Sequence, residues 1–327
     1  RGFQQEEGKH YGPDGKPAPV ASEMAARIIL ALVAMASWLA CAADAGGAFL
    51  AGRLKNGERI FMEIPEGCRK CYPSFFLLQL QRALHGLAQA AMAFFREATK
   101  ALKLIGLHRN DAGPCLHYLW GRGKLTVIMA WVDDILIAGP KKAALEAKKK
   151  LMQVFDCKDI GEMTGCAGCA AERGKGWLKM AQPVGLRKIE DELGPKQHCS
   201  KGRIPAAPAE PGKALSQGEQ GEEQPKEDHK TYQSGCGLLL HIVQWTRQEA
   251  LNAVRELTGH MHKSTTKHMK AMYRCMNYLI STPERGYTIR PDREWDGSDN
   301  FMFRLLGKSE SEYLTYADCK SVRSEEH

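Results

Sequence analysis

Residues 125–139 read LTVIMAWVDDILIAG, and this segment has the most informative pattern in the sequence. Apart from Thr126, the run is apolar up to Asp133 and Asp134, and it is apolar again until Gly139 ends it. Short apolar runs rich in β-branched residues are typical of buried strands, although periodicity alone also allows a helix. The pattern predicts two buried strands that meet in an acidic turn.

The two carboxylates in this turn need a favourable environment. Adjacent negative charges repel each other, and burying a bare charge costs several kcal/mol, so Asp133 and Asp134 must face solvent or a cation. Hard divalent cations prefer such oxygen ligands. An ordinary Asp-Asp hairpin turn is the structural alternative, because Asp is a common turn residue.

Length and composition indicate an ordinary globular chain. It has 327 residues, of which 43% are hydrophobic and 26% are charged. This is enough for a sizeable core and for about two domains by the length prior. The formal net charge of +8 is compatible with a polyanionic partner but does not require one.

The cysteines and the longest uncharged segment bear on the cellular setting. Eleven cysteines, an odd number, without an apolar signal region at the N-terminus predict reduced thiols in the cytoplasm or the nucleus. Residues 28–43 are uncharged but shorter than the ~20 residues that a membrane-spanning helix needs. We therefore expect no membrane partner.

The acidic turn and a second motif carry a resemblance to a known family. Trp131-Val132-Asp133-Asp134 resembles the Tyr-Val-Asp-Asp box of reverse transcriptases, and its surroundings resemble the Ty1/copia class of retrotransposons. Residues 41–54, CAADAGGAFLAGRL, resemble the Asp-Val-Lys-x-Ala-Phe-Leu-x-Gly motif of that class. The resemblance implies that Asp44, Asp133 and Asp134 are catalytic and hold Mg²⁺ (or Mn²⁺).

A third block is similar to the region that meets the template in this family. Residues 77–95 resemble Leu-x-Lys-Ala-Leu-Tyr-Gly-Leu-Lys-Gln-Ala-Pro-Arg-Ala-Trp. The resemblance implies nucleotide or template binding by Gln89, Gly86, Arg82 and Phe49. Arg82 keeps a basic residue, but the Tyr, the second Lys, the Pro and the Arg of the motif are replaced by His85, Ala88, Ala91 and Met92. These changes remove charge and rigidity from the face meant for nucleic acid.

The resemblance implies an α+β fold: a right-hand polymerase palm with partial fingers, then helical thumb and connection, then the start of a truncated ribonuclease H domain. The predicted domains are 1–198 for partial fingers and palm, 199–231 for a flexible linker, 232–312 for thumb and connection, and 313–327 for the ribonuclease H start. Asp318 falls on the first catalytic position of that last domain. The basic finger strands that precede the matched region in the family are absent from the sequence given.

Patterning also predicts individual elements. Residues 24–43 are expected to form a helix, with Ile28, Leu32, Met35 and Leu39 at helical spacing. Residues 141–155 are expected to form an amphipathic helix with five lysines outward. Its predicted inward side chains are Ala144, Leu145, Leu151, Met152 and Phe155. A strand is expected around Lys158–Glu162, whereas residues 166–170 are weak as a strand.

Together these features predict an RNA-directed DNA polymerase that transfers nucleotides onto a primer 3′-hydroxyl by a two-metal mechanism. Its partners would be an RNA or DNA template with primer, dNTPs and, as a further candidate, other parts of a Pol polyprotein. One alternative is a catalytically dead remnant that binds nucleic acid or protein. Another is a metal-binding module built on Cys68, Cys71, Cys166 and Cys169, although 94 residues between the pairs is far from zinc-ribbon spacing.

Overall fold

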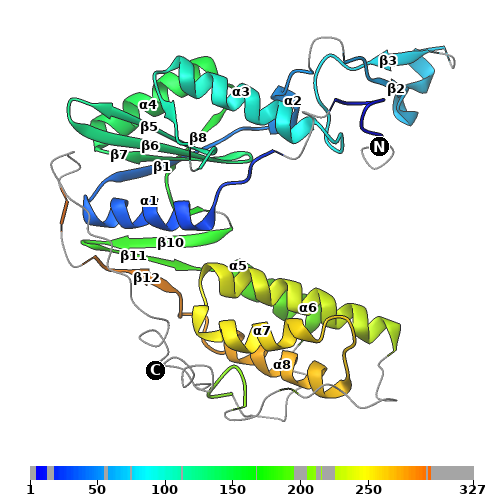
Figure 1. Cartoon of the computed structure of the whole chain (residues 1–327), viewed down its shortest axis with the longest axis vertical. Helices are drawn as coiled ribbons and strands as arrows, with labels where there is room; N and C mark the ends of the chain where they lie inside the picture. Colours follow the sequence, from blue (N-terminus) through cyan, green and yellow to red (C-terminus); the bar gives the residue numbers. More distant parts are fainter. Residues whose placement is uncertain are drawn as a thin grey trace. The chain divides into compact units, whose positions relative to one another are not determined.

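The computed structural model describes residues 5–12, 18–54, 58–73, 76–111, 113–166, 168–194, 205–210, 215, 225–291 and 294–295. The chain forms two compact units (Figure 1). Unit 1 comprises Arg1–Met163 with Pro291–Phe301, and unit 2 comprises Thr164–Arg290 with Met302–His327. Most of the predicted linker, and all of the predicted ribonuclease H start with Asp318, lie outside the described residues.

Unit 1 is built on a six-stranded antiparallel sheet in the order β4-β5-β6-β7-β1-β8. Its central strands are almost entirely buried, as expected for apolar runs that are covered on both faces. The two strands predicted on either side of the acidic turn are confirmed as β6 and β7. The strands are β1 (Leu39–Asp44), β4 (His108–Arg109), β5 (Leu116–Gly121), β6 (Lys124–Trp131), β7 (Asp134–Gly139) and β8 (Lys158–Glu162).

Helices cover both faces of this sheet (Figure 1). On one face, α3 (Ala90–Leu104) and α4 (Lys141–Val154) pack their apolar side chains against Ile128, Ile135 and Ile137. On the other face lies α1 (Glu23–Met35). The smaller elements are α2 (Ala48–Ala51), η3 (Glu66–Cys71) and the hairpin of β2 (Phe61–Glu63) with β3 (Leu77–Gln79).

The predicted helix over residues 24–43 is wrong beyond Met35. Ser37 adopts a left-handed backbone with φ 48°, and the N–H of Trp38 donates to the carbonyl of Val33. This is the pattern of a Schellman motif, which ends a helix. Residues 39–44 instead form β1, because pairing with β7 and β8 outweighs the local helical preference.

The predicted helix over residues 141–155 is confirmed as α4, but its orientation differs in part. Leu145 and Met152 are exposed, whereas Lys148, predicted outward, is buried. The ammonium of Lys148 bonds the carboxylate of Asp159 on β8 at 2.6 Å. A buried charge needs such a partner, so this ion pair explains why the lysine faces the sheet.

Unit 2 combines a four-stranded antiparallel sheet, in the order β12-β11-β10-β9, with a helical core. Within the segment predicted to be weak as a strand, Cys166 ends β9 and Cys169 begins β10, and the two residues are paired. The strands are β9 (Gly165–Cys166), β10 (Cys169–Gly174), β11 (Trp177–Ala181) and β12 (Tyr287–Ile289). The helices are α5 (Pro183–Leu193), α6 (Lys226–Trp245), η5 (Gln248–Ala250), α7 (Leu251–Gly259) and α8 (Thr266–Ile280).

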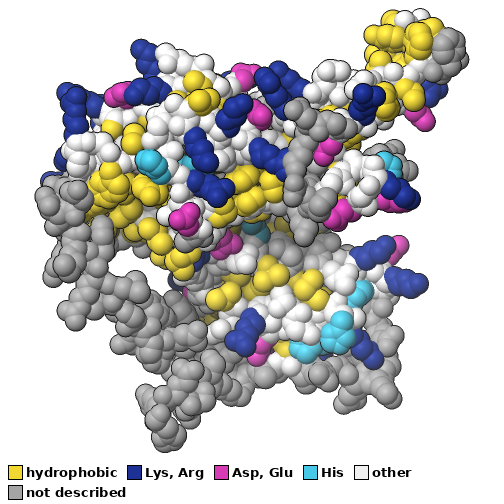
Figure 2. Space-filling view, turned by 45° about the horizontal axis from the view of Figure 1, so that its top comes forward, with side chains coloured by type: hydrophobic (Ala, Val, Ile, Leu, Met, Phe, Trp, Pro, Cys, Tyr) yellow, Lys and Arg dark blue, Asp and Glu magenta, His cyan; other side chains and the backbone are white. Residues whose placement is uncertain are grey.

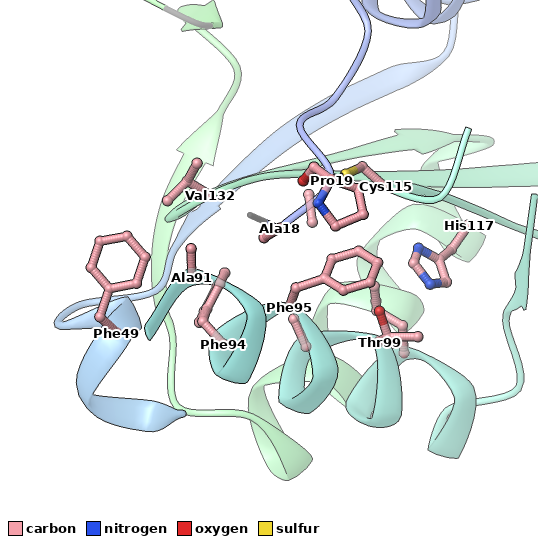
Figure 3. Close-up of a pocket in the computed structure, with 13 residues that line it drawn as sticks. Ala18, Pro19, Phe49, Ala91, Phe94, Phe95, Thr99, Cys115, His117 and Val132 are labelled. Carbon is pink, nitrogen blue, oxygen red and sulfur yellow. Dashed lines mark hydrogen bonds between the residues drawn. The ribbon is translucent and has the colours of Figure 1, made fainter. Parts of the chain in front are cut away.

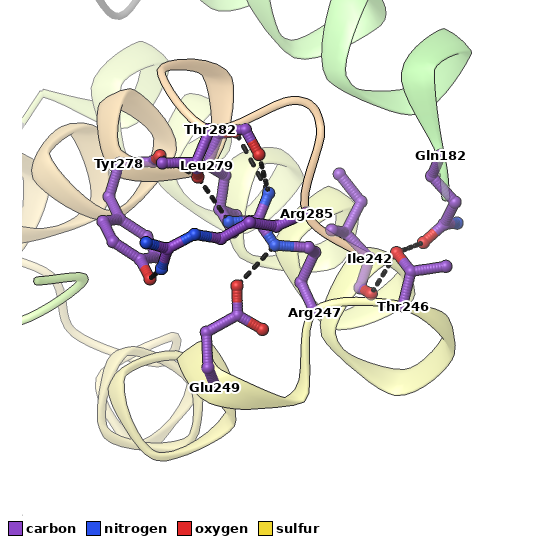
Figure 4. A network of polar contacts seen from close by, with 9 residues as sticks. All are labelled: Gln182, Ile242, Thr246, Arg247, Glu249, Tyr278, Leu279, Thr282 and Arg285. Carbon is purple, nitrogen blue, oxygen red and sulfur yellow. Dashed lines mark hydrogen bonds and ion pairs between the residues drawn. The ribbon is translucent and has the colours of Figure 1, made fainter. Parts of the chain in front are cut away.

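A buried cation, Arg247, lies in the helical core of unit 2 (Figure 4). Its guanidinium donates to Glu249 at 2.5 Å, to the carbonyl oxygens of Leu279 and Thr282 at 3.2 and 3.0 Å, and to the Thr282 hydroxyl at 2.5 Å. It also lies 5.6 Å from the centre of the Tyr278 ring. Arg247 thereby ties η5 to the C-terminal end of α8.

Within the described residues, no helix is both long enough and apolar enough to cross a membrane.

Candidate active site

The acidic turn is a tight hairpin between β6 and β7. Trp131 and Asp134 form the last pair of the ladder, so Val132 and Asp133 are the turn residues. Val132 has φ 52°. Two-residue hairpin turns use positive φ at the first turn position, where glycine is favoured, and a β-branched residue is an outlier there. The turn is therefore held in a strained backbone conformation.

Strand β1 brings the third acidic residue beside this turn. Asp44 pairs with Asp134 in the β1–β7 register, and the N–H of Ala45 donates to the carbonyl of Asp133 at 2.9 Å. Directly opposite residues on antiparallel strands have Cβ atoms about 5 Å apart and on the same face. Asp44 and the Asp133–Asp134 turn, which are distant in sequence, are thus adjacent at the ends of the central strands.

The electrostatics of the three carboxylates follow from this proximity. Burial raises the pKa of Asp134, and the negative charges of Asp133 and Asp44 raise it further. On the other side of Asp44, Lys158 of β8 is its register partner. The sheet therefore presents a row of Asp134, Asp44 and Lys158 in which acidic charge predominates.

The donor chemistry of the site suits a hard divalent cation, since carboxylate oxygens are the ligands that Mg²⁺ and Mn²⁺ prefer. The raised pKa of Asp134 fits this, because a cation would offset the mutual repulsion of the carboxylates. No group of three His, Cys, Asp or Glu side chains in the described part of the chain is arranged to hold a metal ion. The ligand roles of Asp44, Asp133 and Asp134 remain a prediction.

A small cavity of about 30 Å³ lies under the turn (Figure 3). Phe49 of α2 and Val132 line one end, and Thr99 and His117 line the other. Phe49 packs edge-on against His85, with ring centres 5.0 Å apart. The turn, α2 and α3 thus share one apolar interior beside the carboxylates.

Comparison with known proteins identifies the family. A family model described as reverse transcriptase (RNA-dependent DNA polymerase) matches residues 1–197. The chain belongs to the reverse transcriptase family. This confirms the resemblance drawn from the acidic turn and its flanking motifs.

Individual relatives agree with this assignment. The chain is 28% identical to the Retrovirus-related Pol polyprotein from transposon RE1 of Arabidopsis thaliana, over 89% of this chain and 19% of that protein. It is 25% identical to the Pol polyprotein from transposon TNT 1-94 of Nicotiana tabacum, over 86% and 21%. The putative transposon Ty5-1 protein YCL074W of Saccharomyces cerevisiae is 22% identical, over 69% and 71%. The chain spans about a fifth of the length of the two Pol polyproteins.

Of the other residues predicted from the reverse transcriptase motifs, Phe49 lies on α2, and the rest occupy the segment that leads into α3. Gln89, predicted to bind nucleotide or template, is buried at the N-terminus of α3, and its amide nitrogen has no hydrogen-bond partner among the described residues. Gly86 has φ 87°, a backbone conformation that favours glycine. Arg82 is exposed and bridges to the backbone of Arg53. Their binding roles also remain a prediction.

The structure reveals two residues whose roles the motifs did not specify. Gln5 accepts a hydrogen bond from the N–H of Ala88 at 2.8 Å and donates to the side chain of Gln89 at 3.1 Å, so it secures the segment before α3. Asp159 also accepts the N–H of Gly161 at 2.7 Å, which explains the Lys-Asp-x-Gly pattern of β8.

Proposed function

We propose that the chain contributes the catalytic carboxylates of a copia-type RNA-directed DNA polymerase. The observation that carries this proposal is the register of β1 with β7, which sets Asp44 opposite Asp134 and beside Asp133. Membership of the reverse transcriptase family supports the same chemistry. The expected substrates are dNTPs and a primer on an RNA or DNA template.

The carboxylates of Asp44, Asp133 and Asp134 would hold Mg²⁺ or Mn²⁺. When bound, two such ions stabilise the attacking and leaving oxygens of nucleotidyl transfer. The chain's own contribution is to hold the carboxylates in place, through the strained turn at Val132 and the bond from Ala45 to Asp133.

Primer extension with Mg²⁺ or Mn²⁺ tests this proposal. The double variant Asp133→Asn, Asp134→Asn should lose extension by at least about a hundredfold, because the metal-binding charge is removed. Asp191→Asn, an exposed change on α5, is the matched control and should leave the rate unchanged. Direct binding of Mn²⁺, followed by electron paramagnetic resonance, should be weakened in the double variant alone. Equal Mn²⁺ binding by all three proteins would contradict the proposal.

A further inference from the structure

A groove on the outer face of α3 carries a concentration of positive charge. The groove has a volume of about 450 Å³ and is lined by Arg96, Lys100, Lys103 and Arg109, with no acidic lining residue. Figure 2 shows Lys and Arg side chains close together on the face of unit 1 turned toward the viewer. The first three cations follow α3 at intervals of three or four residues, which places them on one side of the helix.

These cations are available to a ligand. Lys100, Lys103 and Arg109 are exposed, and none of their three side chains forms an ion pair or hydrogen bond within the described part of the chain. Three unneutralised charges around one groove repel each other, so a polyanion that enters it is favoured.

Apolar surface lies between the charges. Phe95 and Leu104 line the groove, and Leu104 is 69% exposed. At its floor, Thr99 is 91% buried, and its hydroxyl has no hydrogen-bond partner among the described residues. Cations interleaved with aromatic and apolar surface are typical of sites for single-stranded nucleic acid, where phosphates meet the charges and bases meet the apolar groups. An acidic peptide would match the charges but has no bases to pack against the apolar surface.

The cations of the groove lie further along α3 than the residues beneath the acidic turn. Ala91 of α3 lines the cavity under the turn, and Lys100 lines the groove nine residues later, which corresponds to about 14 Å of helix. Phe95 and Thr99 line both the cavity and the groove. The charged part of the groove is therefore displaced along α3 from the turn that carries Asp133.

We propose that this groove, the α3 groove, binds the phosphodiester backbone of a single-stranded nucleic acid. This inference extends the proposed function, because it assigns a second nucleic-acid contact outside the carboxylate site. The binding itself requires no catalysis and no metal ion.

Fluorescence anisotropy with a labelled single-stranded oligonucleotide of about twelve residues, without divalent ions, tests the α3 groove. The variant Lys100→Gln, Lys103→Gln, Arg109→Gln should bind at least about tenfold more weakly at low salt. The negative slope of its log affinity against log salt concentration should become shallower by about 2, as expected when three contacts to a single strand are lost. The matched control Lys141→Gln, Lys142→Gln, Lys149→Gln removes the same charge from exposed positions on α4 and should stay within twofold of the unchanged chain.

Two further measurements keep the test decisive. The charge-preserving variant Lys100→Arg, Lys103→Arg, Arg109→Lys should bind like the unchanged chain. If the Gln variant fails to fold, photocrosslinking of a thiouridine-containing oligonucleotide to the unchanged chain replaces it, and crosslinks should map to residues 95–109.

Three outcomes would overturn the proposal. The α4 control variant could bind the oligonucleotide as weakly as the α3 variant, or the crosslinks could map outside residues 95–109. Poly-glutamate could also compete with the labelled oligonucleotide as well as an unlabelled oligonucleotide does. Primer extension separates the two proposals. If the chain does not extend primers but the α3 variant still binds the oligonucleotide more weakly than the α4 variant, the proposed groove is supported and the proposed polymerase function is not. If the chain extends primers but the two variants bind equally, only the proposed groove is rejected.

Discussion

His117 is a completely buried histidine in the sheet of unit 1. Neither ring nitrogen meets the geometry of a hydrogen bond within the described residues. Burial lowers the pKa of His117 to about 4, the backbone of Cys115 offsets part of this shift, and the charges of Arg109 and Lys103 add to it. The folded state therefore holds His117 neutral.

This residue predicts a loss of stability in acid. In the unfolded chain histidine titrates near 6.5. The unfolded state thus binds more protons between pH 6.5 and about 4, and stability falls as the pH falls through that window. The free energy of unfolding should drop by about 2 kcal/mol from pH 7 to pH 4.5 on account of His117.

Urea unfolding at the two pH values measures this contribution. The variant His117→Leu should lose most of the 2 kcal/mol difference, whereas His108→Leu, at an exposed site on β4, should keep it. An unchanged pH dependence in His117→Leu would show that other groups cause the acid sensitivity.

Gly52 shows how a single motif residue is required by packing. A Cβ atom at this position would lie 2.8 Å from both the Cβ of Ala93 and the backbone nitrogen of Phe94. The loop after α2 therefore approaches α3 more closely than any side chain allows.

We expect Gly52→Ala to lower the free energy of unfolding by about 1–3 kcal/mol, the usual cost of overpacking. Gly46→Ala is the control, because nothing lies within 4 Å of a Cβ built there. Urea unfolding compares the two variants. Similar stabilities would mean that the loop relaxes without cost.

At the scale of elements, the ends of helices in unit 2 depend on Arg247. The guanidinium satisfies two carbonyl oxygens at the end of α8 and pairs with Glu249 (Figure 4). Removing it leaves the half-buried carboxylate of Glu249 without its ion-pair partner and takes one donor from each of the two carbonyl oxygens. The loss of a buried cation with several charge-assisted hydrogen bonds is among the more costly single changes in a protein.

We expect Arg247→Leu to destabilise unit 2 by about 3–5 kcal/mol. Arg247→Lys should recover little of this, because an ammonium cannot reproduce the planar fork of donors. Arg255→Leu on α7, an exposed position, is the control. Unfolding followed by circular dichroism gives the comparison, and a stability close to that of the control would contradict this role.

At the scale of the whole molecule, the carboxylate positions keep the residues of the copia-type motifs, but the positions expected to support the template do not. The acidic positions match the copia-type motifs, whereas Ala88, Ala91 and Met92 stand where those motifs have Lys, Pro and Arg. Ala88 lies just before α3, and Ala91 and Met92 lie in its first turn; this is the element expected to support the template. Positioning supplies much of the rate in phosphoryl transfer, so carboxylates without that support should give little turnover.

We therefore expect weak primer extension by the unchanged chain. The variant Ala88→Lys, Ala91→Pro, Met92→Arg should raise the rate by about tenfold or more, because orientation of the template contributes strongly to rate. Proline is tolerated in the first turn of a helix, so α3 should persist. The same three changes combined with Asp133→Asn and Asp134→Asn should remain inactive. Robust extension by the unchanged chain would contradict this prediction.

The sequence by itself determined the central hairpin and the family. The apolar arms around Asp133 and Asp134 have the period and composition of buried strands, and a tight turn between such arms is a local property. It also determined α4 and β8, whose boundaries lie close to those predicted. The motif residues around Asp44 and Gln89 carried the resemblance to reverse transcriptases, and the family match confirmed it.

The contacts between residues that are far apart in sequence came only from the tertiary structure. Residues 39–44 have no strong local preference for a strand, and they form β1 because β7 and β8 offer unpaired backbone groups on both sides. The inward turn of Lys148 depends on Asp159, and the burial of His117 depends on the packing of α3, none of which local sequence encodes. Strand register and ion pairing are long-range properties: the resemblance implied that Asp44 shares a site with Asp133 and Asp134, but its pairing with Asp134 on one side and Lys158 on the other came only from the folded sheet.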